Sequence, residues 1–489
     1  MSGRSQNTER RDGAEATVEA GAHASFQGLI GVARADITPP VEIYSRNWGA
    51  ARHDVAESIH RPLTLTVLTL AKDAESRPLV LIDADLGWWR SRTMFQTFQS
   101  RLLNELALDA SSLIVALTHT HSAVTLTGHD PQLPGSELLD EYVDRLARTA
   151  IETAHEAIRT ATRSTLDWHM GRCQLASVRD FHDPGASDGR VVCGYDPSAQ
   201  ADDTLVVGRV TDLAGVTRVC LVNYACHPTT LAWENTTISP DFIGAMRETV
   251  EAHTGGAPAM FLQGASGDLA PRYQYVGDPS VADRHGRQLA FAALATLEDM
   301  DPPATRLVYN GVVESGAPLA VWRYEALACC AKLIARETTV GLPLKNWPTA
   351  ERLEQERLTC EDRTAEERLR RRRDIRRELG DGDTYRLPLF TCRIGDAVLV
   401  GSMVEAYSYL QRELRRRFSE RTVICLNLIN GSIGYLPPAE MYDLDVYQVA
   451  QTPFARGGLE AMVDRFEQSI RAVVEDDEPR RASLETSHP

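Results

Sequence analysis

Short β-rich runs alternate with segments of helical pattern along most of this 489-residue sequence. The runs LTLTVLTLA and PLVLIDADLGWW precede the helical segment TMFQTFQSRLLNEL, and LIVALTH precedes LLDEYVDRLARTAIETAHEAIRTA. Alternation of this kind is typical of α/β proteins, in which helices cover the faces of a sheet. The sequence therefore predicts an α/β fold, and its 43% hydrophobic residues are enough to bury a large core.

Three segments depart from this pattern. Residues 1–26 and 476–489 are polar and poor in aliphatic residues, which predicts disordered tails. The length of the chain allows one large unit or two fused halves between them. From about residue 320 to residue 385 the sequence is densely charged and includes a long stretch of helical pattern. We expect a solvated helical insertion in this region.

Charge and composition exclude several classes of partner. The net charge of -16 would repel nucleic acid and anionic membranes, so we expect a small neutral or cationic substrate. The sequence has no apolar run of about 18 residues to serve as a membrane anchor, and its start lacks the apolar segment of a signal peptide, which predicts a cytoplasmic protein. Nine cysteines without C-x-x-C spacing indicate reduced thiols. The sequence defines no oligomeric state.

Histidines and a carboxylate follow three of the apolar runs. His119 and His121 come after LIVAL, and alternation along a strand would turn both toward one face. His227 follows VCLVNYAC, and Glu405 follows VLVGSMV among uncharged residues where an unpaired carboxylate would be costly to bury. Two or three imidazoles with a carboxylate are a common ligand set for catalytic zinc, which keeps one position for water.

The glycine-rich segment FLQGASGDLAP is a further candidate. Its glycines allow close approach of backbone to a ligand, and Asp268 could orient a histidine or bind a cation. Residues 264–268 read Gly-Ala-Ser-Gly-Asp, so they lack the last glycine of the G-x-S-x-G nucleophile motif. A serine-hydrolase elbow is therefore disfavoured. Cys226, beside His227, is the one cysteine with a candidate role.

Six motifs in fixed order across residues 29–470 resemble those of one enzyme family. They are GVARADITPP, ADLGWW, LTHTHS, ACHPT, QGASGDLAP and NGSIGYLPP. Together they are similar to the neutral ceramidase superfamily, whose members are zinc-dependent amidases that cleave N-acylsphingosine. The resemblance implies one catalytic domain at residues 27–475, built from layered mixed β-sheets flanked by helices.

The resemblance also assigns roles by position. The implied zinc ligands are His119, His227, Glu405 and Tyr435. His121 would steady the carbonyl oxygen of the substrate, and Arg179 in LASVRDFH would share that task. Tyr447, twelve positions after Tyr435, would assist proton transfer.

The chain departs from the family pattern in two respects. Where ceramidases usually read Gly-Asp-Val-Ser-Pro, this chain has Ala270 at the serine position, which rules out a serine acyl-enzyme there and leaves metal-activated water. Full ceramidases carry a C-terminal immunoglobulin-like domain, whereas this sequence ends soon after GGLEAMVDRFEQSIRAVVED. We therefore expect a small soluble amide as substrate and not a membrane sphingolipid.

The sequence predicts a zinc-dependent amidohydrolase that acts on a linear N-acyl bond. Three alternatives remain open at this point. The same scaffold could hydrolyse an ester or a lactone, or it could be a catalytically inactive, ceramidase-like binding protein. An amidohydrolase barrel also uses an H-x-H pair, but that pair should open the first of eight strand-helix repeats.

Overall fold

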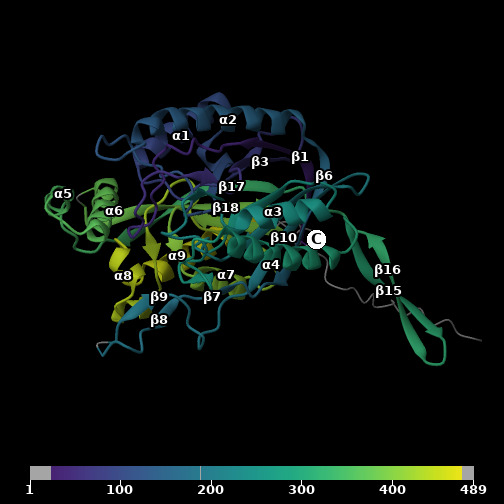
Figure 1. Ribbon diagram of the computed structural model, residues 1–489. Coiled ribbons are helices and arrows are strands. Elements are labelled where there is room, and N and C mark those ends of the chain that lie inside the picture. The colour runs from purple at the N-terminus through teal and green to yellow at the C-terminus, as the bar shows by residue number, and fades with distance from the viewer. Residues whose placement is uncertain (1–23, 188, 381, 476–489) are drawn as a thin grey trace, which may run out of the picture.

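The computed structural model describes residues 24–187, 189–380 and 382–475 (Figure 1). The predicted tails at 1–26 and 476–489 thus lie outside the described residues, with the exception of residues 24–26. These begin strand β1 (Ala24–Asp36), and the side chain of Phe26 is completely buried. The tail prediction is wrong for these three positions because Phe26 belongs to the hydrophobic core between two sheets.

An eight-stranded mixed sheet forms the centre of the molecule, in the order β13-β11-β10-β6-β1-β3-β4-β5. The pairs β4/β5 and β11/β13 are parallel and the other neighbours are antiparallel. Besides β1, the strands are β3 (Thr64–Ala71), β4 (Leu79–Ala84), β5 (Leu113–Leu117), β6 (Thr162–Arg172), β10 (Thr204–Asp212), β11 (Thr217–Tyr224) and β13 (Ala259–Gln263).

A four-stranded sheet packs against one face of the first. Its order is β17 (Leu333–Pro343), β18 (Thr384–Ile394), β19 (Ala397–Ser402) and β21 (Val423–Leu426), with β19 and β21 parallel. Leu68 and Leu70 of β3 meet Phe390 and Leu399 of the second sheet in one core cluster. The two sheets are therefore the inner layers of the fold.

Helices cover the outer faces of both sheets. On β3, Leu65 and Val67 point away from the second sheet and pack in a cluster with helix residues such as Phe98 and Leu146. This alternation of apolar side chains on β3 explains why both of its faces are buried. The covering helices are α1 (Arg92–Glu105), α2 (Leu139–Arg159), α3 (Phe242–His253) and α4 (Pro279–Glu298) on the large sheet, and α7 (Tyr409–Arg417) and α9 (Gly458–Val474) on the small one. The expected layered, mixed α/β architecture is confirmed.

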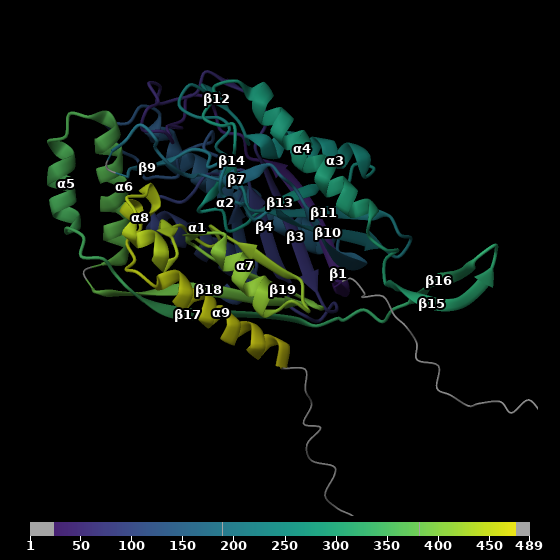
Figure 2. The ribbon, with the colours of Figure 1, turned by 90° about the horizontal axis from the view of Figure 1, so that it is seen from below.

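Two hairpins extend from this body, as Figures 1 and 2 show. Strands β15 (Thr305–Glu314) and β16 (Pro318–Ala326) form a projecting ribbon, and helices α5 (Ala350–Leu358) and α6 (Arg363–Leu379) pack side by side at the opposite end. The expected helical insertion at about 320–385 therefore holds only for residues 350–379. Residues before it form β16 and β17, because the β-branched run in LIARETTVGLP pairs along its full length with β18.

Short elements complete the chain. They are β2 (Ser58–Ile59), β7 (Ala176–Val178), β8 (Asp180–His182), β9 (Val191–Cys193), β12 (Thr237–Ile238), β14 (Leu269–Pro271), β20 (Glu405–Ala406), β22 (Tyr435–Leu436) and α8 (Tyr447–Gln451). Among the described residues, no helix is both long and apolar enough to cross a membrane.

Candidate metal centre and active site

The candidate ligands follow strands that pair in parallel. His119 comes two residues after β5 and His227 three residues after β11. Glu405 lies in β20 just after β19, and Tyr435 lies in β22 soon after β21. Because β20 and β22 are parallel and pair Glu405 with Tyr435, these two side chains are direct neighbours. Strand β5 lies at one end of the eight-stranded sheet and β11 near the other, but β13, the neighbour of β11, also contacts β5, so the segments after β5 and β11 approach each other.

The two histidines of THTHS are neighbours for a different reason from the one the sequence suggests. Strand β5 ends at Leu117, so the alternation of strand side chains does not extend to them. His119 instead has a left-handed backbone with φ of +70°, and its ring lies 4.9 Å from that of His121, centroid to centroid. A positive φ is unfavourable for histidine by about 1–3 kcal/mol and is typical of functional sites.

Three ligand atoms form a nearly equilateral triangle. The Nε2 atoms of His119 and His227 are 3.1 Å apart, and Oε2 of Glu405 lies 3.2 Å from the first and 3.1 Å from the second. A tetrahedral zinc ion with bonds of about 2.0–2.1 Å would hold its ligand atoms about 3.3 Å from one another. The triangle therefore has the size that such an ion requires.

The protons of both imidazoles point away from this triangle. Nδ1 of His119 lies 3.1 Å from the carbonyl oxygen of Gly87, and Nδ1 of His227 lies 2.6 Å from that of Ser266. An imidazole bonded to a carbonyl in this way keeps its proton on Nδ1, so Nε2 presents a lone pair.

Burial lowers the pKa of His227 to about 3, so this ring is neutral at pH 7. For Glu405, burial would raise the carboxyl pKa, but His119 and His227 outweigh that effect and lower it well below its usual value. With each imidazole proton on the Nδ1 that is bonded to a backbone carbonyl, the two Nε2 lone pairs and the Glu405 carboxylate face one another in the protein interior. A cation between them would relieve this repulsion, so the donor set fits a metal ion.

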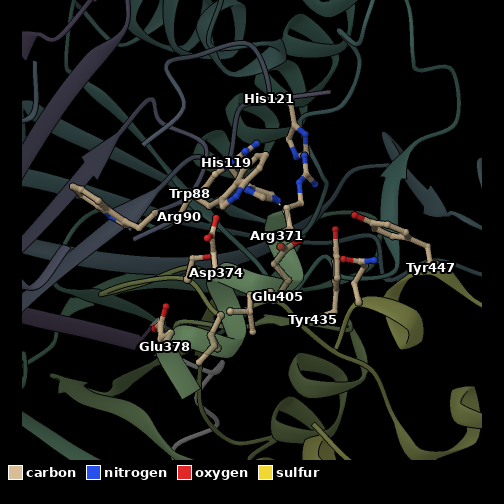
Figure 3. A pocket seen from close by; sticks show the side chains of 16 residues that line it. Trp88, Arg90, His119, His121, Arg371, Asp374, Glu378, Glu405, Tyr435 and Tyr447 are labelled. Carbon is tan, nitrogen blue, oxygen red and sulfur yellow. Dashed lines mark ion pairs between the residues drawn. The ribbon is translucent and has the colours of Figure 1, made fainter. Parts of the chain in front are cut away.

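Tyr435 and His121 border the triangle, as Figure 3 shows. The Tyr435 ring stacks on that of His227 with a centroid distance of 6.3 Å. The three histidines also form a looser group, with ligand atoms within 4.8 Å of one another. We regard Glu405 as the better third ligand because its distances to both Nε2 atoms are shorter.

His121 has buried ring nitrogens that find no hydrogen-bond partner in the described part of the chain. Burial, followed by the proximity of His119 and His227, lowers its pKa well below the usual value. The ring is therefore neutral and offers one N–H to a ligand.

Arg179 and Tyr447 both lie against the ring of Tyr435. The Arg179 guanidinium lies 5.5 Å from the centroid of the Tyr435 ring, and its Nε and Nη2 both donate to the carbonyl oxygen of Gly267, at 3.1 and 2.8 Å. The Tyr447 ring lies 5.7 Å from that of Tyr435. A cavity beside the triangle is lined by His119, His121, Glu405, Tyr435 and Tyr447. Arg179 lines a neighbouring cavity that shares His121, Tyr435 and Tyr447 with the first, and His227 is not among the lining residues of either.

Asp268, in the loop of residues 264–268, does not orient a histidine as the sequence suggested. Both carboxylate oxygens of Asp268 accept hydrogen bonds from Ser408, one from the backbone N–H and one from the hydroxyl, each at 2.6 Å. Burial raises the pKa of this carboxyl to about 6. Asp268 therefore ties the loop to the segment after β20, and the carbonyl of Ser266, not Asp268, orients His227.

Two other positions prove to be structural. Ala270 is completely buried in β14, where it pairs with Ser177 of β7. Cys226 is also completely buried, and burial raises the pKa of its thiol well above the usual value. Neither side chain is among those that line the cavity.

Several residues of the site were not predicted from the sequence, although Trp88 belongs to one of the six motifs. Trp88 of the ADLGWW motif packs against both His119 and His121, at centroid distances of 5.6 and 4.9 Å. Helix α6, which the sequence suggested to be solvated, supplies Glu367 and Arg371 to the interior. Oε1 of Glu367 accepts from Arg90 at 2.8 Å and from Arg371 at 3.1 Å, which brings the charged helix against the site.

Solved ceramidase structures share this architecture. A ceramidase complexed with C2 matches with a TM-score of 0.65 at 15% identity, and the match covers 96% of this chain and 77% of that one. A neutral ceramidase from Pseudomonas aeruginosa matches with a TM-score of 0.66 at 17% identity, covering 93% and 75%. The chain has the neutral ceramidase fold. No family model and no curated protein sequence matches this chain.

Proposed function

We propose that this protein is a zinc-dependent hydrolase that cleaves the amide bond of a small N-acyl substrate. The observation that carries the proposal is the triangle of His119, His227 and Glu405, in which both imidazole protons are directed outward to backbone carbonyls. The likeness to ceramidase structures adds support for an amide as the scissile bond.

In this proposal zinc is held by His119, His227, Glu405 and Tyr435. Bound zinc acts as a Lewis acid and lowers the pKa of a coordinated water from 15.7 to about 7. Glu405 contributes the negative charge of the ligand set. The hydrogen bonds that the two imidazoles donate to the carbonyl oxygens of Gly87 and Ser266 fix which nitrogen each histidine presents.

His121 and Arg179 would donate to the carbonyl oxygen of the substrate, where negative charge develops during amide cleavage. Arg179 is buried and is held in place by Gly267 before any substrate arrives, and the ring nitrogens of His121 are buried. Fixed donors of this kind are each worth on the order of 3 kcal/mol of barrier. The unpartnered nitrogens of His121 fit this role, because a buried donor without a partner costs about 1–3 kcal/mol until a ligand satisfies it.

Tyr447 would pass a proton to the departing nitrogen, since an amine is a poor leaving group unless it is protonated. Tyr447 lines the same cavity as His119, His121 and Tyr435, as Figure 3 shows. An ester or lactone needs this proton less, so the same site would hydrolyse such bonds with less dependence on Tyr447.

Metal analysis of the purified protein together with a panel of N-acyl compounds tests the proposal. We expect about one zinc per chain, hydrolysis of at least one amide, and loss of both in His119→Ala. The proposal fails if the protein contains less than about half an equivalent of zinc and His119→Ala retains activity. A protein that binds zinc but cleaves no amide or ester would be a binding protein of the same fold.

A further inference from the structure

A second cavity of about 580 Å³ opens beside the metal centre. It shares His121, Arg371, Tyr435 and Tyr447 with the first cavity, so a molecule in one would reach the other. Helix α6 and the segment around Trp48 both line it, and Arg371 of the helix donates a hydrogen bond to the carbonyl oxygen of Asn47 at 2.9 Å. The chemical group that this cavity binds would define the substrate class of the enzyme. This assignment rests on the proposed function.

The walls of this cavity are rich in arginine. Its described lining residues include four arginines and one carboxylate, Glu367; the arginines are Arg179, Arg190, Arg368 and Arg371. Glu367 is already shared by Arg90 and Arg371, and these arginines outweigh the effect of burial and lower its pKa to about 2. The cavity is thus positively charged inside a chain of net charge -16. This local charge argues against the neutral or cationic substrate that the overall charge suggested.

Several donors in this cavity have no partner. Arg371 uses Nε for Glu367 and Nη2 for the carbonyl oxygen of Asn47 at 2.9 Å, so Nη1 remains without a hydrogen bond within the described chain. Arg368, an exposed residue at the rim of this cavity, has no ion pair with any described residue. The indole Nε1 of Trp48 is buried and likewise without a partner among the residues described. These groups are all donors and suit an acceptor that carries negative charge.

Other arginines of helix α6 behave differently. Arg370 pairs with Asp130 and Glu366, and Arg373 pairs with Glu354. Both line a separate polar cavity in which carboxylates accompany the arginines. In that cavity four carboxylates accompany six arginines, whereas one carboxylate accompanies four arginines beside the metal centre.

Aromatic side chains form the rest of the wall. Trp48 lies 6.1 Å from Trp233 and 5.7 Å from Tyr275, and Trp233 and Tyr275 lie 5.9 Å apart, centroid to centroid. Such a cluster is suited to contact with an apolar group. The aromatic residues and the arginines line the same cavity. The cavity therefore combines an apolar surface with a site for one negative charge.

We propose that this cavity binds a free carboxylate of the substrate, with the apolar part of the same molecule against Trp48, Trp233 and Tyr275. A substrate with a carboxylate close to its scissile amide is an N-acyl amino acid or a compound of that class. Hydrolysis then adds one water across the amide and releases a carboxylic acid and an amino acid. Arg371 and Arg368 act as specificity residues because they contact the carboxylate and not the reacting atoms.

Binding of two probes without an amide bond tests this proposal, since it needs no turnover. Tryptophan fluorescence of the zinc-loaded protein is titrated with 3-phenylpropanoate and with 3-phenylpropan-1-ol, which differ in charge at one end. We expect the carboxylate to bind at least about tenfold more tightly than the alcohol. Arg368→Met and Arg371→Met should each weaken carboxylate binding about tenfold and leave alcohol binding unchanged.

Arg352→Met is the matched control, because Arg352 lies on the same helical hairpin with its side chain 72% exposed and paired with Glu356. It should bind both probes as the unmodified protein does. Arg371 also bonds to Asn47 and Glu367, so its replacement could affect folding, and Arg368→Met, which loses no such bond, carries the test in that event.

Equal binding of both probes would overturn the proposal, and so would a carboxylate preference that survives in both arginine variants. The second result would indicate that the probe binds the metal directly. These outcomes are independent of amide hydrolysis. Preference for the carboxylate without any amidase activity would support the carboxylate site and refute the proposed function. Turnover of uncharged amides together with equal binding of both probes would support the proposed function and refute the carboxylate site.

Discussion

Gly267 controls the distance between the GASGD loop and the strand that carries Glu405. A Cβ atom added at this position would lie 2.8 Å from the carbonyl oxygen of Glu405, 2.8 Å from Cδ1 of Tyr407 and 3.0 Å from the carbonyl oxygen of Ala406. Ordinary contacts of this kind begin near 3.4 Å. Gly267→Ala therefore has to move β20 or the loop by about half an ångström, and two of the three obstacles are backbone atoms that cannot rotate away.

The shift acts on the site through two routes. It displaces Glu405 relative to the histidines, and it moves the Gly267 carbonyl oxygen that holds Arg179. Active sites tolerate about 0.5 Å of error, and 1 Å of displacement costs about a hundredfold in rate. We expect Gly267→Ala to lower kcat/KM by about 10- to 100-fold and zinc affinity by about tenfold, with a loss of about 1–3 kcal/mol in unfolding free energy.

Chelator competition, steady-state kinetics and urea denaturation measure these three quantities. Gly128→Ala is the control, because no atom lies within 4 Å of the added Cβ at that position. A Gly267→Ala protein with unchanged zinc affinity and unchanged kcat/KM would show that the loop and β20 do not define the position of Glu405. The argument from the triangle would then lose its geometric basis.

Three further predictions concern single groups. Tyr447→Phe should lower kcat/KM for an amide by about 10² or more while an ester of the same acid loses less, and equal losses in a paired assay would argue against Tyr447 as the proton donor. Removal of zinc should lower the melting temperature, because a ligand present at about 1,000 times its Kd stabilises the folded state by about 4 kcal/mol, and calorimetry before and after zinc is returned measures the effect. Burial raises the pKa of Asp241, the N-cap of α3, to about 6, so the folded protein binds a proton at pH 4–6 that the unfolded chain has released. The unfolding free energy should therefore fall as pH rises through this range, and Asp241→Asn should show a shallower fall in denaturation curves recorded at several pH values.

The sequence indicates His119, His227 and Glu405 as candidate ligands because each follows an apolar run, and buried strands end where polar side chains can gather. His227 and Glu405 illustrate the point, since the runs before them become β11 and β19 of two different sheets. No sequence pattern indicates that those sheets pack face to face. That arrangement depends on side chains such as Leu68 and Phe390, which meet only in the folded core.

The proximity of His119 and His121 was predicted for the wrong reason. Strand alternation was a reasonable basis, but β5 ends before the pair and a left-handed residue makes the turn. A positive φ at a non-glycine residue leaves no mark in the sequence. It is imposed by surrounding contacts, among them the bond from the His119 N–H to the carbonyl oxygen of Leu86 at 2.9 Å.

The role of helix α6 was the least predictable feature. A dense run of arginine and glutamate resembles a solvated helix, and most of its ion pairs lie within the hairpin. The pair that matters for the site joins Glu367 to Arg90, whose side chains are 5% and 4% exposed. Charge density in a sequence gives the composition of a helix but not the partner that its buried face will meet.

Helix α6 supplies none of the candidate zinc ligands, yet it forms a wall of the chamber beside them. All four of those ligands are held by strands of the body and the loops that follow them. Replacement of helix α6 would alter which molecules enter the chamber without disturbing the reacting groups. A scaffold divided in this way can acquire new substrates through changes at its periphery, while its interior chemistry stays the same.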